Sequence, residues 1–291
     1  MSNSPLISYQ EITPKAHQLQ QLIKLYYVHQ SKEDALEERI VYFPNYTTTI
    51  NIYKDSKLSW NALSRTHEPD IGAPWMKLLV AKFDRSREII MRGPFHKLSI
   101  VFQPLGINHF LEPPLSQIAE DHFTFFDYFG PEFDALLDQV FELDQLEAKR
   151  DLLDDFFIKN YVGFSEDRLK FAVQEILDNE ASVSIQQLSE TLQISRKTLL
   201  RLFKKHLAIS PTDYKSIVKF RKALLAYQDK KNRPSLADLA YTVDYYDQSD
   251  LNFHFKQKTG QTPQELFKIL KTIEKDLFWQ IAHVPKVQDK Q

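Results

Sequence analysis

The chain has 291 residues, of which 43% are hydrophobic and 26% charged, and this composition is ordinary for a globular protein with room for two domains. It contains no cysteine, which excludes disulfides, thiolate zinc sites and cysteine nucleophiles. Its first residues lack the basic and apolar regions of a secretory signal, and no apolar run approaches the ~20 residues of a membrane helix. We therefore expect a cytoplasmic protein with no membrane partner.

The first half of the chain has the texture of a β domain. We expect the first 30 or so residues to be helical or irregular. From Arg39 to about Gln103, β-branched and aromatic residues predict strands, and pairs such as Asp55-Ser56 mark the turns between them. The clearest predicted strands are residues 47–53, 76–83, 88–91 and 96–102. Such short strands favour a small, cupin-like β-barrel or a sandwich.

Helices are predicted to follow this β region. Phe133, Leu137 and Val140 share one helical face, and Leu153 with Phe157 belongs to a second apolar stripe. These helices could act as a linker, a dimer surface or both. We expect residues 1–164 to form a β-rich regulatory or dimerisation domain with trailing helices.

Residues 165–291 are predicted to be all helical, and they differ from the rest in charge. Ser165 is a candidate N-cap for a helix through Leu177. This part holds 21 basic and 16 acidic residues, although the whole chain has a net charge of −2. Between Arg196 and Arg233 twelve basic residues stand against two acidic ones. Such a local excess is typical of a surface that binds a polyanion.

An internal repeat organises this helical region. The apolar positions of one segment recur 51 or, after one extra turn residue, 52 positions later. The matching pairs are Leu188 with Leu239, Leu192 with Val243, Leu199 with Leu251, Phe203 with Phe255, and Pro211 with Pro263.

Each repeat has the parts of a helix-turn-helix. Ser184 with Gln187 forms a capping box, and Ser235 opens the second unit in the same way. A tight turn follows, and Ser195 or Asp247 is the polar cap of the second helix. In such a unit the second helix enters the major groove of DNA, which is about 12 Å wide.

A connecting helix is predicted from Tyr214 to about Gln228. Ile217, Phe220 and Leu224 recur on it at helical spacing. A rigid connector would hold two recognition helices roughly 34 Å apart, as two successive major-groove segments require. The plainer alternative is a helical bundle that contains a duplicated hairpin.

The residues resemble those of the AraC family of transcription regulators, over about Ser182 to Phe267. The matching elements include Leu188-Ser-Glu-Thr-Leu-Gln-Ile-Ser195, Leu202-Phe-Lys-Lys205 and Gly260-Gln-Thr-Pro263. The resemblance implies an α+β chain with a β-rich regulatory domain and a DNA-binding domain, residues 165–291, with its core at 182–267. The family often has Gly at the turn of each unit, where this chain has Gln193 and Asp244.

The resemblance also implies which positions meet DNA, and elementary chemistry supports several of them. Arg201 could bind guanine through two hydrogen bonds, and Leu200 could contact a thymine methyl group. Asp250 could accept from cytosine, although phosphates would repel it. The expected DNA-binding residues are Arg196, Lys197, Leu200, Arg201, Lys204 and Lys205 in the first unit, and Gln248, Ser249, Asp250, Asn252, Phe253 and Lys256 in the second.

Two other classes of function compete with a sequence-specific DNA-binding regulator. One is a metal-dependent cupin-type enzyme fused to a DNA-binding domain, but the candidate ligands His67, His96, His109 and His122 show no His-x-His pair. The six glycines form no nucleotide-binding motif, so we expect neither an enzyme nor a cofactor. The other is a helix-turn-helix module that binds proteins instead of DNA.

Double-stranded DNA is the expected partner, and RNA polymerase, a small-molecule effector and a second copy of the chain are further candidates. Aromatic side chains of the β region could line an effector pocket or simply form its core. These are Tyr42, Phe43, Tyr46, Trp60, Trp75 and Phe83.

Overall fold

The computed structural model describes residues 7–60, 65–81, 84–179, 182–228, 233–269, 271–272 and 278–282. The N-terminal elements are β1 Ser8–Ile12, α1 His17–Gln20, β2 Ile23–Ser31, β3 Glu37–Tyr42, β4 Thr48–Lys54, β5 Ser56–Trp60, β6 Arg65–Pro69, β7 Met76–Val80, β8 Arg87–Arg92, β9 Phe95–Phe102, the 3-10 helix η1 Gly106–Phe110, α2 Leu115–Ile118, β10 Phe123–Phe125, α3 Gly130–Glu142 and α4 Leu146–Lys159. The later elements are α5 Asp167–Asp178, α6 Ile185–Thr191, α7 Arg196–Leu207, α8 Pro211–Gln228, α9 Leu236–Thr242, α10 Gln248–Thr259, α11 Pro263–Ile269, β11 Lys271–Thr272 and β12 Phe278–Ala282.

The strands of the described residues form two six-stranded sheets. One has the order β1-β2-β9-β4-β7-β10 and the other the order β11-β12-β3-β8-β6-β5. Neighbouring strands run antiparallel except β6 and β8, which are parallel. Near the end of the chain, β12 pairs with β3, in the register Trp279 opposite Tyr42. The second sheet therefore contains strands from both ends of the sequence.

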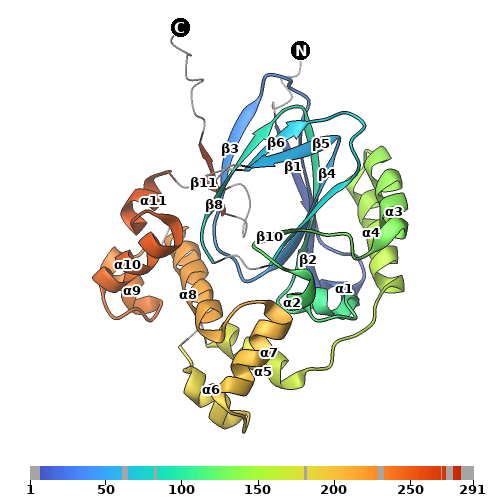
Figure 1. Ribbon diagram of the computed structural model, residues 1–291. Helices are drawn as coiled ribbons and strands as arrows, with labels where there is room; N and C mark the ends of the chain where they lie inside the picture. Colours follow the sequence, from blue (N-terminus) through green and yellow to red (C-terminus); the bar gives the residue numbers. More distant parts are fainter. Residues whose placement is uncertain are drawn as a thin grey trace.

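Two apolar clusters cover the two faces of the first sheet. On the face toward the second sheet, Tyr27, Leu78 and Met91 belong to one buried cluster. On the other face, Val28 and Ile100 pack with Phe133 and Phe157 of α3 and α4. Figure 1 shows α3 and α4 on one side of the sheets and α8 to α11 on the other. Strands of the first sheet are thus buried on both faces, as a central layer requires.

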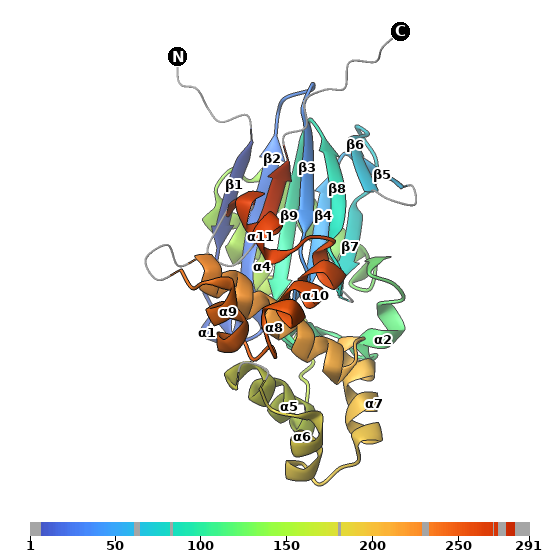
Figure 2. The ribbon, with the colours of Figure 1, turned by 90° about the vertical axis from the view of Figure 1, so that its left-hand side faces the viewer.

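The C-terminal helices have two cores of their own, and each core includes side chains of the β region. Leu105 belongs to the cluster of α5 to α7, and Tyr46 packs against that cluster. Phe43 belongs to the cluster formed by α8 to α11. Figure 2 shows α5 to α7 below the sheets, with α8 leading up to α9 and α10. The β region and the helical region therefore share apolar contacts.

The predicted fold class is confirmed: a β-rich N-terminal part with helices precedes a helical region, α5 to α11. Three details of the expectation were wrong. Residues 165–291 are not all helical, because β11 and β12 follow α11 and β12 joins the second sheet. Residues 8–12 and 23–31 are strands, not helical or irregular segments. The α5 helix begins after Glu166 without a side-chain cap, so Ser165 is not its N-cap.

Candidate nucleic-acid interface

The first helix-turn-helix unit consists of α6, a tight turn and α7. The Ser184 side chain accepts a hydrogen bond from the Gln187 amide, and the Gln187 side chain accepts one from the Ser184 amide, so the predicted capping box is present. Ser195 caps α7 through the Thr198 amide at 3.1 Å. The turn residue Gln193 has a φ of 53°, a left-handed conformation that favours glycine.

The second unit repeats this construction with α9 and α10. Ser235 accepts a hydrogen bond from the Asp238 amide, and Asp247 accepts one from the Asp250 amide. Asp244 takes the left-handed turn position with a φ of 59°. Leu251 and Phe255 of α10 are fully buried, so their spacing of four residues fixes α10 against α9.

The connector α8 joins the two units, and lysines of the predicted basic cluster form hydrogen bonds within the protein there. Lys215 donates to the carbonyl oxygen of Val183, which precedes α6. Lys219 donates to the carbonyl and the carboxylate of Asp244, with its amine 2.8 Å from the carboxylate oxygen. These lysines tie α8 to a segment of each unit. They therefore add less to a DNA-binding surface than their charge suggests.

All six predicted DNA-binding residues of the first unit are exposed on α7. This helix has no acidic residue, and its basic residues project from a helix that Leu199 and Phe203 hold in the core. Five of the six, all but Arg196, line a surface cleft of about 550 Å³ together with Thr198 and with Ser116 of α2. The sixth, Arg196, lies at the turn.

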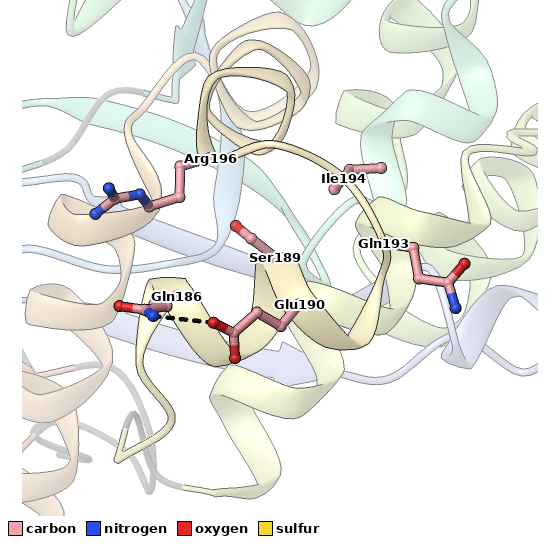
Figure 3. Close-up of a pocket in the computed structure, with 6 residues that line it drawn as sticks. All are labelled: Gln186, Ser189, Glu190, Gln193, Ile194 and Arg196. Atoms are coloured by element: carbon pink, nitrogen blue, oxygen red, sulfur yellow. Dashed lines mark hydrogen bonds between the residues drawn. The ribbon is translucent and has the colours of Figure 1, made fainter.

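A smaller hollow of about 370 Å³ lies at this turn, between α6 and the start of α7 (Figure 3). It is lined by Gln186, Glu190 and Arg196, and the Gln186 amide donates to the Glu190 carboxylate at 2.9 Å. In a helix-turn-helix the first helix crosses the DNA backbone, so the Arg196 guanidinium is placed to contact a phosphate, whereas the Glu190 carboxylate would repel one. The hollow is open and polar and extends the surface of α7.

The second unit presents a different surface. The segment 184–207 holds five basic residues and one acidic residue, whereas the segment 235–259 holds two basic and four acidic residues. Asp250, predicted to read a base, accepts a hydrogen bond from the Tyr246 amide at 3.1 Å and lies 3.3 Å from the His254 ring. Phe253 is 57% exposed, and Gln248, Ser249 and Lys256 are exposed as well.

Comparison with known proteins agrees with this geometry. Residues 188–269 match a family model described as a helix-turn-helix domain. The chain carries an AraC-type helix-turn-helix domain. No curated protein sequence matches the chain.

Three solved structures are similar to parts of the chain. One is the C-terminal domain of AraT, a response regulator from Geobacillus stearothermophilus, with 22% identity, a TM-score of 0.32, and coverage of 37% of this chain and 88% of that one. The second is a variant of apo ToxT from Vibrio cholerae, with 12% identity, a TM-score of 0.42, and coverage of 92% and 99%. The third is unsaturated fatty acid bound ToxT from the same species, with 11% identity, a TM-score of 0.37, and coverage of 89% and 93%.

Outside the AraC-type domain, the apolar cluster between the two sheets also encloses buried polar side chains. Lys97 is fully buried there and donates to the hydroxyls of Tyr27 and Tyr42, each at 2.9 Å. Burial lowers the pKa of Lys97 to about 7. His67 is 1% exposed and stacks on Tyr53, and neither of its ring nitrogens has a hydrogen-bond partner.

The histidines considered as metal ligands lie apart. His67 is between the sheets, His109 stacks on Tyr161, and His122 faces Asp84. Within the described ranges, no group of three or more His, Asp or Glu side chains could hold a metal ion. No helix of the same ranges is long and apolar enough to cross a bilayer.

The aromatic residues expected to line one pocket are also dispersed. Phe43 and Tyr46 pack against α8, on Phe220 and Tyr214 respectively. Trp75 packs on Phe141 of α3. Of that set, Tyr42 contacts the buried Lys97. Phe83 and the Trp60 side chain lie outside the described residues.

Three residues beside the AraC-type domain were not found from the sequence. Ser116 borders the α7 cleft, Asn108 donates to the carbonyl oxygen of His206 at 3.0 Å, and the Ser86 amide donates to that of Lys258 at 2.7 Å. No local pattern marks them, because each acts on a residue far along the chain.

Proposed function

We propose that the chain is a sequence-specific DNA-binding transcription regulator that reads base edges chiefly with α7. The observation that carries this proposal is the surface of α7: five exposed basic residues and no acidic one, on a capped helix fixed by the core. Such a helix fits the electrostatic requirements of the major groove.

The proposed roles follow from side-chain chemistry and from position on α7. Arg201 and Lys197 donate to base edges, where an arginine pairs best with guanine O6 and N7. Leu200, 36% exposed, contacts a thymine methyl group. Arg196, Lys204 and Lys205 contact phosphates and set the position of the helix without reading sequence.

We propose that α10, the second recognition helix, binds the next major-groove segment and contributes less binding free energy than α7. Gln248, Ser249 and Asn252 can donate to and accept from base edges, and Lys256 can contact phosphate. The Asp250 carboxylate already accepts a hydrogen bond from the Tyr246 amide and lies beside His254, so it is less available to accept one from cytosine. Phe253 can make apolar contact with a thymine methyl group.

We further propose that residues 1–164 form a regulatory domain and residues 165–291 the DNA-binding domain. A polar small-molecule effector is proposed to bind between the two sheets, because a buried polar group without a partner is costly and His67 has two such nitrogens. A thermal-shift screen of small polar metabolites tests this. We expect a stabilising compound to lose its effect with His67→Phe, and an equal shift with both proteins would contradict the site.

A salt titration tests the proposed function. The full chain is titrated with a labelled 40-base-pair duplex of random sequence at several salt concentrations. The four proposed phosphate contacts, from Arg196, Lys204, Lys205 and Lys256, should make log K fall against log salt with a slope of about −3 to −4, at roughly 0.9 per contact. Absence of binding at low salt, or binding that does not respond to salt, would contradict DNA recognition by α7.

One observation favours a second function for the second unit. Tyr241 is 89% and Tyr246 is 93% exposed, and both lie among acidic residues of the α9–α10 segment. Exposed aromatic residues are enriched at protein interfaces, whereas acidic residues repel phosphates. If this surface serves a protein partner alone, Asn252→Ala should leave DNA affinity and base preference unaltered, and if α10 reads bases it should alter them.

A further inference from the structure

A short helix of the N-terminal part lies against the recognition helix of the first unit. α2 packs on α7, and its Ser116 shares a cleft with Lys197, Leu200 and Arg201. A second cleft of about 500 Å³ also contains Ser116, together with Lys204. The residues proposed to read DNA therefore face a segment of the regulatory part.

This position of α2 conflicts with insertion of α7 into DNA. The major groove is about 12 Å wide and 8.5 Å deep, so a recognition helix enters only if the space along its exposed face is free for the groove walls. Ser116 borders that space beside Lys197 and Lys204, at both halves of the helix. Because Ser116 lies on the same side of α7 as these side chains, a duplex that approached them would meet α2.

The C-terminal end of α7 also contacts the N-terminal part of the chain, next to α2. Asn108 of η1, which is buried, donates its side-chain amide to the carbonyl oxygen of His206 at 3.0 Å. Ala208, directly after α7, packs against the apolar cluster of α3 and α4. Gly106 allows η1 to sit there, because a Cβ atom at this position would lie 1.9 Å from the Leu22 carbonyl oxygen. The contact between α2 and α7 is thus part of a built interface.

The second unit also forms a hydrogen bond with the β region. The Ser86 amide donates to the carbonyl oxygen of Lys258 in the last turn of α10, at 2.7 Å. Figure 2 shows α7 and α10 running in different directions. To enter successive major-groove segments of one straight duplex, two recognition helices must face the same side of the DNA. The hydrogen bonds from Asn108 to His206 and from Ser86 to Lys258 hold the two helices against the β region and oppose that arrangement.

We propose that this arrangement is a closed state, in which α2 lies beside the exposed reading face of α7, obstructs the approach of a duplex and must separate from α7 before DNA binds. This inference rests on the proposed function. A protein that is mostly closed binds DNA with an affinity reduced by the open fraction, so any change that opens the interface raises the apparent affinity. The regulatory part then controls DNA access by contact with the recognition helix itself.

Cross-linking tests the closed state directly, because the chain has no cysteine of its own. Ser116→Cys and Thr198→Cys are introduced together, since both residues line the same cleft and neither has a proposed DNA contact. One sample is bridged with a short bis-maleimide, and the matched control has both thiols capped with N-ethylmaleimide. The probe is a labelled 40-base-pair duplex of random sequence at low salt.

We expect the capped protein to bind the duplex and the bridged protein to bind at least about tenfold more weakly. Equal affinity of the two samples would overturn the closed state, and so would failure of the bridge to form within one chain. If neither sample nor the unmodified protein binds DNA, the proposed function fails with it. The two failures are therefore distinguishable.

Loosening the interface gives the opposite prediction. Asn108→Ala removes the hydrogen bond to His206, whereas the control Asn160→Ala removes an equivalent bond to Phe156 within α4. We expect Asn108→Ala to raise DNA affinity by about three- to tenfold and Asn160→Ala to leave it unaltered, with circular dichroism confirming that both fold. No gain for Asn108→Ala in a folded protein would contradict the proposal.

Discussion

The backbone amide of Ser86 lies 2.7 Å from the carbonyl oxygen of Lys258, and this bond joins the segment before β8 to the last turn of α10. The last carbonyls of a helix have no partner within it, so an outside donor stabilises the helix end. The side-chain amide of Asn108 likewise donates to the carbonyl oxygen of His206 at the end of α7. Both recognition helices therefore end on donors from the β region, and movement of the DNA-binding helices must break these bonds.

Replacing Arg201 with alanine should relax the preference for one base pair. The guanidinium is exposed on α7 and can form two hydrogen bonds to guanine, which are worth about 1–3 kcal/mol of discrimination. Affinities for a selected duplex and for its single-base substitutions check this. A loss that is equal for all these duplexes would show that Arg201 contacts phosphate instead.

Neutralising Lys204 and Lys205 should weaken binding to every duplex alike. Both amines are exposed, and removing each amine from its phosphate should reduce the slope of log K against log salt by about 0.9. Lys219→Gln is the matched control, because its amine is held by Asp244. We expect Lys219→Gln to lower the melting temperature and to leave the salt slope as it is, and a reduced slope would place Lys219 on DNA.

Loss of a helix cap should destabilise each unit by a similar amount. Ser195→Ala removes the acceptor for the Thr198 amide, and Asp247→Ala removes the acceptor for the Asp250 amide. Each should lower the free energy of unfolding by about 1 kcal/mol, as N-cap replacements typically do. Denaturant unfolding measures this, with Ser249→Ala as a control whose hydroxyl lies inside the first turn of α10. Equal stability of cap and control variants would contradict the assignment.

Stability should fall as the pH drops from 7 to 5. Burial lowers the pKa of His67 to about 3, below the 6.5 of an unfolded chain. Between these two values the unfolded chain binds the proton and the folded protein does not, so protonation favours unfolding. One such histidine should cost about 2 kcal/mol between pH 7 and 5.

The matched variants for this pH effect are His67→Phe and His17→Phe. Phenylalanine at position 67 keeps a ring against Tyr53 and removes the titration, whereas His17 is exposed. Melting curves over this pH range should be flatter for His67→Phe than for the unmodified protein. Curves of equal slope for all three proteins would show that His67 is not buried in its neutral form.

The sequence predicted the AraC-type domain well because its determinants are local. The caps at Ser184, Ser195 and Asp247 and the left-handed turns are specified within a few residues, and the structure has all of them. The strand β2 was missed because it is buried on both faces and therefore lacks the alternation that reveals a strand. The tie between Asn108 and His206 joins residues 98 positions apart, which no periodic pattern records.

Charge alone was a weaker guide to the interface. The twelve basic residues between Arg196 and Arg233 predicted a surface that binds a polyanion. The structure divides them, because Lys215 and Lys219 of α8 bind to carbonyl and carboxylate oxygens of the two units. The side chains on α7 stay exposed, so the predicted surface is concentrated on the first unit.

Selection of binding sites from a random duplex pool by the purified full chain tests the central claim most directly. We predict one strongly enriched block of base pairs read by α7, with a weaker block about one helical turn, 10–10.5 base pairs, away. The strong block should lose one preferred position when Arg201→Ala is used for the selection. Recovery of sequences no different from the starting pool would contradict the claim that α7 reads DNA.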